Sequence, residues 1–209
     1  MMTDVVIFLL EKGKRMKDLQ NKILVEGTVI GSEILKVDCF LNHQLDIDFL
    51  GKVAQEFYER FKDKPIDRIL TVEVSGIAIA ALVAQHFHVP VVFAKKLQSK
   101  TLNEDMFISK VYSFTKRVDY DIRVSKKFLH AGDHILLIDD FLAKGQAVLG
   151  LIDICEQAEA VIEGIGIVIE KDFQQGGSLI RAKGYNLVSL ARIMNMNEQE
   201  IIFWEEEDV

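Results

Sequence analysis

Length, composition and charge describe an ordinary globular chain. It has 209 residues, 49% of them hydrophobic and 27% charged, which suits one compact domain. The formal net charge of −7 argues against a non-specific nucleic-acid binder, which would present a basic face. Cys39 and Cys155 show no metal or redox spacing, so we expect a reduced, cytoplasmic protein in which both thiols are buried.

The first 15 residues do not fit the rest of the chain. Residues 5–10 are apolar but too few to span a bilayer, and the positive charges follow them, which is the wrong order for a signal peptide. Met16 is itself a plausible first residue. We therefore expect residues 1–15 to be a non-native or poorly packed extension, and residues 16–209 to form a single domain without a membrane span.

Helices and strands alternate through the first half of the chain. The apolar periods predict, in order, a helix at 17–24, a helix at 46–61 capped by Asp46 or Asp48, a strand at 67–76, a helix at 77–87 and a strand at 91–96. Ser75 and Gly76 stand where the helix at 77–87 begins. They indicate either an anion cradle of backbone amides or an ordinary Ser cap with a permissive glycine.

Two stretches between these elements are harder to assign. Residues 33–44 mix apolar side chains with Asn42, His43 and Gln44, as a surface hairpin would. Residues 97–115 begin without a clear period and end in an alternating pattern, which predicts a long hairpin or a mobile lid. Residues 121–125 continue as a strand. The five histidines are too scattered to predict a zinc site, and we expect no metal held by protein ligands alone.

The most informative stretch is residues 134–147. Four branched apolar residues at 135–138 predict a strand buried on both faces, and Asp139 and Asp140 follow where that strand should end. A small-residue loop then leads into a predicted helix at 146–158. Ligands of open parallel sheets lie beyond the carboxyl ends of the strands, and helix N-termini bind anions. The acids can instead be simple caps, or belong to a receiver or haloacid-type phosphatase fold.

The last third adds further strands and one lysine of interest. The expected elements are a buried strand at 162–170, a turn at 174–177, a short helix at 179–184, strands at 188–193 and 201–204, and an acidic tail at 205–208. Lys171 comes at the carboxyl end of the strand at 162–170. It either points at a ligand carbonyl or is an ordinary exposed lysine.

These stretches carry a family resemblance. Ile-Asp-Asp-Phe-Leu-Ala at 138–143 and Gly-Gln-Ala at 145–147 resemble the phosphoribosyl-pyrophosphate (PRPP) signature of type I phosphoribosyltransferases, in detail that of bacterial xanthine enzymes. The stretches at 35–44, 112–116 and 165–174 resemble the same enzymes, and the likeness spans about Met16 to Trp204. Lys144 departs from the pattern, since Asn is expected there, and Val74 replaces a smaller or polar residue.

The resemblance implies an α/β fold, with an open, mostly parallel sheet flanked by helices and a small hood. It implies a reaction of PRPP with xanthine that gives xanthosine 5′-monophosphate and pyrophosphate. By position, Asp139 and Asp140 correspond to the catalytic acids. The residues implied in PRPP binding are Ser75, Gly76, Ala143, Lys144, Gly145, Gln146 and Ala147. Those implied in purine binding are Leu35, Asn42 and Lys171. A strained non-proline peptide is common in the loop at 73–76, and we expect it here.

The resemblance also implies Mg²⁺, held mainly by substrate oxygens, and a cytoplasmic homodimer. We expect small-molecule substrates, with no nucleic acid and no membrane as partners. Two alternatives stay open. One is a hypoxanthine or guanine phosphoribosyltransferase. The other is a PRPP-sensing regulator of the same fold, for which no DNA-binding segment is visible in the sequence.

Overall fold

The structure is a computed structural model that describes residues 17–97, 105–113 and 118–204. The expectation for residues 1–15 and the acidic tail at 205–208 lie outside the described residues. The same holds for residues 98–104 and 114–115 of the predicted hairpin or lid.

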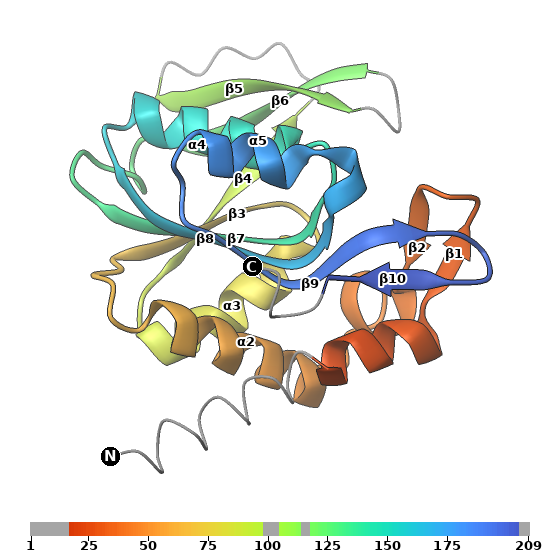
Figure 1. Cartoon of the computed structure of the whole chain (residues 1–209). Helices are drawn as coiled ribbons and strands as arrows, with labels where there is room; N and C mark the ends of the chain where they lie inside the picture. Colours follow the sequence, from red (N-terminus) through yellow and green to blue (C-terminus); the bar gives the residue numbers. More distant parts are fainter. Residues whose placement is uncertain (1–16, 98–104, 114–117, 205–209) are drawn as a thin grey trace.

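A single large sheet forms the centre of the molecule (Figure 1). Its strands are β3 (Arg68–Val72), β4 (Val91–Leu97), β5 (Met106–Ser113), β6 (Val118–Ser125), β7 (His134–Leu142), β8 (Val161–Lys171), β9 (Leu187–Met196) and β10 (Ile201–Phe203). The spatial order is β10-β9-β8-β7-β3-β4-β6-β5. The strands from β9 to β4 run parallel, and antiparallel strands complete both edges. The predicted open, mostly parallel sheet is therefore confirmed.

Helices cover both faces of this sheet. Figure 1 shows α2 (Ile47–Phe61) and α3 (Gly76–Phe87) on one face, and α4 (Gln146–Gln157) and α5 (Gly176–Ala182) on the other. Each face has its own apolar core. Two glycines of β8 let α2 pack closely, because a Cβ at Gly164 would collide with the Phe61 ring and one at Gly166 would lie 2.8 Å from ring carbons of Phe57.

A small hood stands beside the sheet, and we define it as residues 28–42. It contains β1 (Thr28–Ile30), β2 (Ile34–Lys36) and one π-helical turn (Asp38–Asn42). Residues 17–26 form the helix that precedes it. Lys22 of this helix contacts the hood and the start of α2, because its ammonium lies 5.3 Å from the ring centroid of Phe40 and 2.8 Å from the Asp46 carboxylate. Asp46 also caps α2 by accepting a hydrogen bond from the Phe49 amide.

The structure corrects several predicted boundaries. β7 does not end before the acid pair but continues through it to Leu142, because its backbone stays paired with β8 as far as Glu170. Residues 106–113 form a strand, since β6 supplies a ladder of hydrogen bonds along their whole length. The short helix begins at Gly176, inside the predicted turn. Cys155 is buried as predicted, but Cys39 is only half-buried, so that part of the prediction is wrong.

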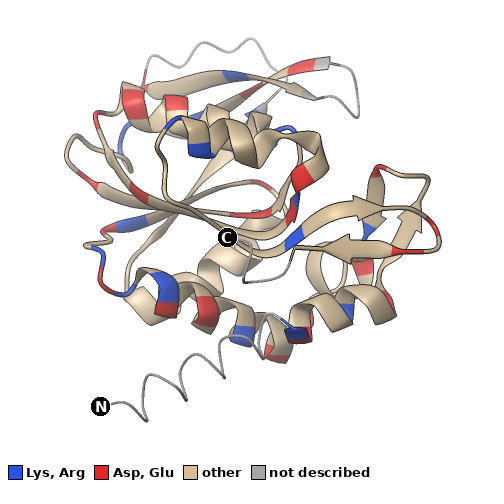
Figure 2. Cartoon of the chain, in the orientation of Figure 1, with Lys and Arg blue, Asp and Glu red and all other residues tan. Residues whose placement is uncertain are grey.

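Charge is spread over the described surface. In Figure 2, Lys and Arg are mixed with Asp and Glu along the helices, and no basic stretch gathers in this view of the described residues. No helix within the described ranges has the length and apolar character needed to cross a bilayer.

Candidate active site

An open cleft lies at the carboxyl ends of β7 and β8. Its volume is about 800 Å³, within the range of small-molecule sites. The lining comes from the hood, the β5–β6 hairpin, the segment after the acid pair and the end of β8. It consists of Glu33, Ile34, Tyr112, Tyr120, Phe141, Leu142, Ala143, Lys144, Gly145, Gln146, Ala147, Val148, Lys171 and Gln174. The sheet therefore brings together segments more than 100 residues apart, at the edge where parallel sheets bind ligands.

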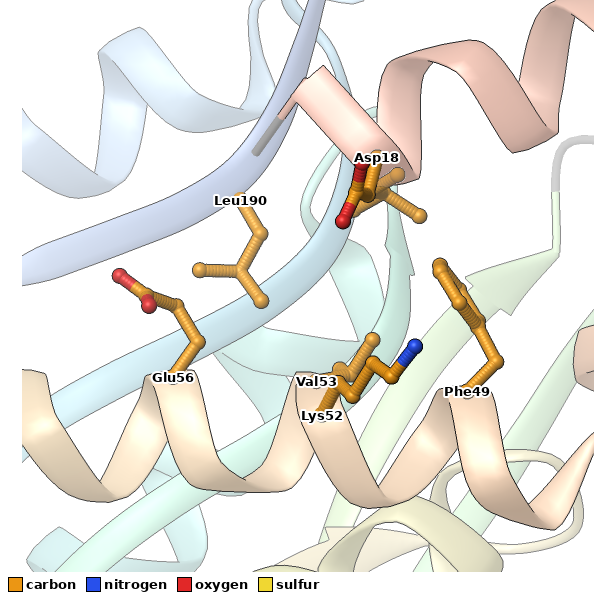
Figure 3. A pocket seen from close by; sticks show the side chains of 7 residues that line it. Asp18, Phe49, Lys52, Val53, Glu56 and Leu190 are labelled. Atoms are coloured by element: carbon orange, nitrogen blue, oxygen red, sulfur yellow. The ribbon is translucent and has the colours of Figure 1, made fainter. Parts of the chain in front are cut away.

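Another cavity, shown in Figure 3, lies between the helix at 17–26, α2 and β9. Asp18, Lys52, Glu56 and Leu190 are among its lining residues. Its volume is about 10 Å³, room for about one water molecule and no substrate. The cleft at the carboxyl ends of β7 and β8 is therefore the candidate site.

The two adjacent acids have different surroundings. Asp139 is only 5% exposed, and its Oδ1 accepts a hydrogen bond of 3.0 Å from the backbone N–H of Asp140. Burial, followed by repulsion from the Asp140 carboxylate, raises the pKa of Asp139 well above its usual range. Asp140 is half-buried, and its Oδ2 accepts a hydrogen bond of 3.2 Å from the Asn42 side-chain amide. One carboxylate is thus packed beneath the site, and the other contacts the hood.

The loop after β7 leaves the N-terminus of α4 open. Gly145 precedes the helix with φ +79°, a left-handed conformation that suits glycine, and no side chain caps the helix there. The Gly176 amide donates to the carbonyl of Ala143 over 3.1 Å, and a Cβ at Gly176 would collide with that carbonyl. α5 therefore packs directly against the loop and fixes its shape. Lys144 is exposed at its tip.

The predicted loop at 73–76 approaches the acid pair from β3. A Cβ at Gly76 would lie 3.0 Å from Oδ1 of Asp139 and would collide with the hydroxyl of Thr71, so only glycine fits there. The peptide between Glu73 and Val74 is cis, which confirms the expected unusual non-proline peptide. Ser75 precedes α3, but its side chain does not cap the helix, so the cap interpretation is wrong. Gly76 therefore lies next to Asp139, and Ser75 directly precedes Gly76 in the chain.

Lys171 lies at the same end of the sheet as the acid pair. Its ammonium donates a hydrogen bond of 2.7 Å to the carbonyl of Glu33 in the hood and lies 5.4 Å from the ring centroid of Phe141. Burial lowers the pKa of Lys171, which distinguishes it from an ordinary surface lysine. The interpretation of Lys171 as freely exposed is wrong, and the side chain lines the cleft.

The two hood residues predicted to bind the purine, Asn42 and Leu35, lie in different surroundings. Asn42 reaches the acid pair through Asp140. Leu35 is only 6% exposed and packs into the core instead of lining the cleft, because side chains alternate along β2. Its neighbour Ile34 lines the cleft and is 48% exposed. The predicted contact of Leu35 with a purine therefore has no support in this arrangement and stays a prediction.

Two residues near the site were not predicted from the sequence. Thr71 is fully buried in β3, and its hydroxyl has no hydrogen-bond partner among the described residues. The sequence feature that could have identified Thr71 is a polar residue in the middle of an apolar strand. Tyr120 lines the cleft, and burial together with the nearby Asp139 raises its pKa. No local sequence pattern identified Tyr120 as a site residue, since its position depends on the pairing of β6 with β5. The described residues contain no group of His, Cys, Asp and Glu able to hold a metal ion.

Comparisons with known proteins agree with this geometry. The family model for the phosphoribosyl transferase domain matches residues 37–196. Among solved structures, adenine phosphoribosyltransferase from Rhodothermus marinus superposes with a TM-score of 0.67 over 86% of this chain and 99% of that one, at 16% identity. The Giardia lamblia enzyme in complex with 9-deazaadenine gives 0.63 over 70% of this chain and 81% of its own, at 28% identity. Fold and site define a type I phosphoribosyltransferase.

Curated relatives narrow the class. Xanthine phosphoribosyltransferase of Clostridioides difficile (strain 630) is 54% identical over 189 residues, which cover 90% of this chain and 100% of that protein. The proteins of the same name from Finegoldia magna and Bifidobacterium longum are 53% and 52% identical, each over 90% of this chain and 99% of the relative. The chain belongs to the xanthine phosphoribosyltransferase family.

Proposed function

We propose that this protein transfers the 5-phosphoribosyl group of PRPP to xanthine, giving xanthosine 5′-monophosphate and pyrophosphate. The observation that carries the proposal is that the acid pair, the open helix N-terminus and the half-buried Lys171 line or adjoin one cleft. The family relationship supports xanthine as the base.

The phosphoribosyl end of the site needs no protein nucleophile. The bond from the anomeric carbon to pyrophosphate breaks, with its electron pair leaving on the pyrophosphate oxygen. The carbon then bonds to a ring nitrogen of the base, and the proton of that nitrogen leaves to solvent. We assign the 5′-phosphate to the amides of residues 143–147 at the N-terminus of α4, where the helix dipole favours an anion. We assign the pyrophosphate to the amides of Ser75 and Gly76, and the ribose hydroxyls to Asp140 and Asp139.

The hood lines the base end of the cleft with Glu33 and Ile34. We assign Lys171 and Asn42 to polar groups of the purine, because Lys171 lines the cleft, Asn42 contacts the adjoining Asp140, and both side chains have donors. In the structure the Lys171 ammonium is bonded to the hood carbonyl of Glu33, so it exchanges that acceptor for an oxygen or nitrogen of the base. Burial lowers the pKa of Lys171, so a polar ligand that accepts a hydrogen bond from its ammonium would favour the charged form.

Mg²⁺ fits this site if substrate oxygens and water supply most of its ligands. Asp139 and Asp140 offer carboxylates, but the described residues provide no cluster of three metal ligands. When bound, Mg²⁺ neutralises the charge of the phosphates and the departing pyrophosphate. The chain's own residues orient the sugar and the base around that charge.

We also propose a homodimer located in the cytoplasm. Large apolar side chains are exposed on the described monomer, among them Val25 at 82% and Phe128 at 57%. Exposed apolar side chains of this size are common at protein–protein contacts when they form a patch. Light scattering at micromolar concentration tests the proposal, and a monomer under those conditions would contradict it.

One assay tests the reaction itself. Pyrophosphate release and nucleotide formation are measured with PRPP, Mg²⁺ and each of xanthine, hypoxanthine, guanine and adenine. We expect the highest kcat/KM with xanthine. A higher value with hypoxanthine or guanine would assign the protein to those bases, and PRPP binding without turnover of any base would indicate a regulator.

A further inference from the structure

Lys171 stands between two acids that the proposed reaction does not use. Glu170 precedes it and points to the opposite face of β8, where its side chain is fully buried. Asp172 follows it. A buried carboxylate is unfavourable unless it is fully paired, so Glu170, and to a lesser degree the half-buried Asp172, need a structural or functional reason.

Glu170 is held from two other elements. Arg181 of α5 donates two hydrogen bonds to its carboxylate, at 2.8 and 2.7 Å. The Ser189 hydroxyl of β9 donates to the same carboxylate. The packing around this group is tight, because a Cβ at Gly177 would collide with it. The carboxylate of Glu170 in turn raises the pKa of Arg181. The end of β8 is thereby joined to α5 and β9.

Asp172 is held by the C-terminal end of the described chain. Its Oδ1 accepts a hydrogen bond of 3.0 Å from the guanidinium of Arg192, and its Oδ2 accepts one of 2.9 Å from the indole N–H of Trp204. The Trp204 amide donates to the Arg192 carbonyl over 3.0 Å, and the guanidinium lies 5.3 Å from the indole centroid. Arg192 also comes within 3.8 Å of the Glu170 carboxylate, so the two acids share one network.

Lys171 itself has much weaker anchoring. Within the described residues its ammonium contacts the Glu33 carbonyl and the Phe141 ring, and no carboxylate forms an ion pair with it. Its four-carbon stem needs a fixed backbone if the ammonium is to meet the base in one place. A network that immobilises the residues on both sides supplies that backbone. Replacing buried ion pairs by apolar groups often does not destabilise a protein, so a positional role explains them better than stability.

We propose that Glu170, Asp172, Arg192 and Trp204 are positioning residues that hold the backbone at Lys171, so that the C-terminal strands set the affinity of the site for the base. This inference rests on the proposed function, because it concerns the base that Lys171 binds. It extends the site to residues that lie outside the cleft lining and touch no substrate.

Trp204→Phe is the most specific variant. It removes the indole N–H that donates a hydrogen bond to Asp172 and keeps an aromatic ring beside Arg192. We expect kcat/KM for xanthine to fall about fivefold, the scale of one lost hydrogen bond, with KM for PRPP unchanged. Asp172→Asn removes the charge that pairs with Arg192, and we expect a larger fall of the same kind. Glu170→Gln changes a fully buried group, so its kinetics are read beside a thermal unfolding curve that shows whether the variant is folded.

A double-mutant cycle separates positioning from general damage. In a Lys171→Ala background, measured at high enzyme concentration, Trp204→Phe has nothing left to position and should leave kcat/KM for xanthine unchanged. An equal loss in both backgrounds, or no loss in either, would overturn the inference. If the wild-type protein does not use xanthine, the proposed function fails. If it does and the cycle shows no coupling, the inference alone fails.

Discussion

The two ends of the central sheet carry similar side chains in opposite conditions. At the amino ends of the parallel strands, polar side chains are paired within the protein: Nε of Arg68 lies 2.7 Å from Oδ2 of Asp133, and Nδ1 of His134 lies 2.6 Å from Oε1 of Glu163. At the carboxyl ends, Asp139 is buried beside another acid, and the half-buried Lys171 is hydrogen-bonded to a carbonyl. Similar side chains are therefore paired at the amino ends, whereas Asp139 and Lys171 at the site have surroundings that disfavour their charged forms.

The pKa directions express this difference. Burial raises the pKa of Asp133, but hydrogen bonds from Arg68 and the His130 amide outweigh it, so the net pKa is lowered. For Asp139 burial and its acidic neighbour act together, and the pKa rises. Groups whose surroundings oppose their charge are typical of functional sites. Changes at the carboxyl end should therefore alter activity first, and changes at the amino end should alter stability first.

The largest effect is expected for Asp140→Asn. The carboxylate is the acceptor that we assign to the ribose, and its loss should lower kcat/KM by at least about 100-fold, the scale of one removed electrostatic contact. Steady-state pyrophosphate release with xanthine and PRPP measures this. A value close to that of the wild type would remove the acid pair from the mechanism.

Lys171→Ala should have the second-largest effect on activity. Loss of a charged donor to the base is expected to lower kcat/KM for xanthine by about 10- to 100-fold, in line with a charge-assisted hydrogen bond. PRPP binding, measured by calorimetry without base, should be preserved. Unchanged kinetics with xanthine would place Lys171 among ordinary surface lysines after all.

Gly76→Ala tests the contact between β3 and the acid pair. The added methyl group would press on Asp139 and the Thr71 hydroxyl, and overpacking of this kind costs about 1–3 kcal/mol. Urea unfolding should show that loss together with reduced turnover. Gly51→Ala is the matched control, because a Cβ there meets no atom within 4 Å. Equal stability of both variants would show that the loop has room to move.

Asp139→Asn should raise thermal stability at neutral pH while reducing activity. The folded state favours the protonated form of Asp139, so burying its charge costs stability as pH rises above the ordinary pKa of 3.8. The advantage of the variant should therefore shrink as pH falls from the raised pKa toward that value. Unfolding curves from pH 4 to 8 test the sign. A variant that is less stable at neutral pH would argue for an unrecognised partner of the carboxylate.

Asp133→Asn is the counterpart at the amino end and should affect activity least. The ion pair with Arg68 is partly exposed, so we expect a loss of about 1 kcal/mol after screening by solvent. Its contribution is present above the ordinary pKa of Asp133 and is lost as pH falls through the lowered one. Turnover at 25 °C should match the wild type. A large fall in kcat would contradict the expectation that changes at the amino end alter stability before activity.

Local pattern predicted much of the fold, but not where the elements end. The branched run at 135–138 identified β7, yet the strand continues through two aspartates because β8 pairs with it. The strand at 106–113 had no clear start in the sequence, since its partner β6 defines it. Tertiary pairing overrides local preference in both cases.

Local sequence pattern also predicted only part of the candidate site. The aspartates, the loop after them and Lys171 were found because each follows a recognisable strand. Leu35 and Ile34 could not be told apart, since one residue of register decides which of them faces the cleft. The buried strand predicted at 162–170 includes Glu170, but the sequence did not identify the partners of its carboxylate, because Arg181 and Ser189 approach it from later elements.

The most direct measurement compares the two ends of the sheet in one reaction. Wild type, Asp133→Asn and Asp140→Asn are incubated with xanthine, PRPP and Mg²⁺, and xanthosine 5′-monophosphate is quantified over time. We predict that the wild type and Asp133→Asn form the nucleotide at similar rates, and that Asp140→Asn forms almost none. Equal product from Asp140→Asn and the wild type, or no product from the wild type, would contradict the account.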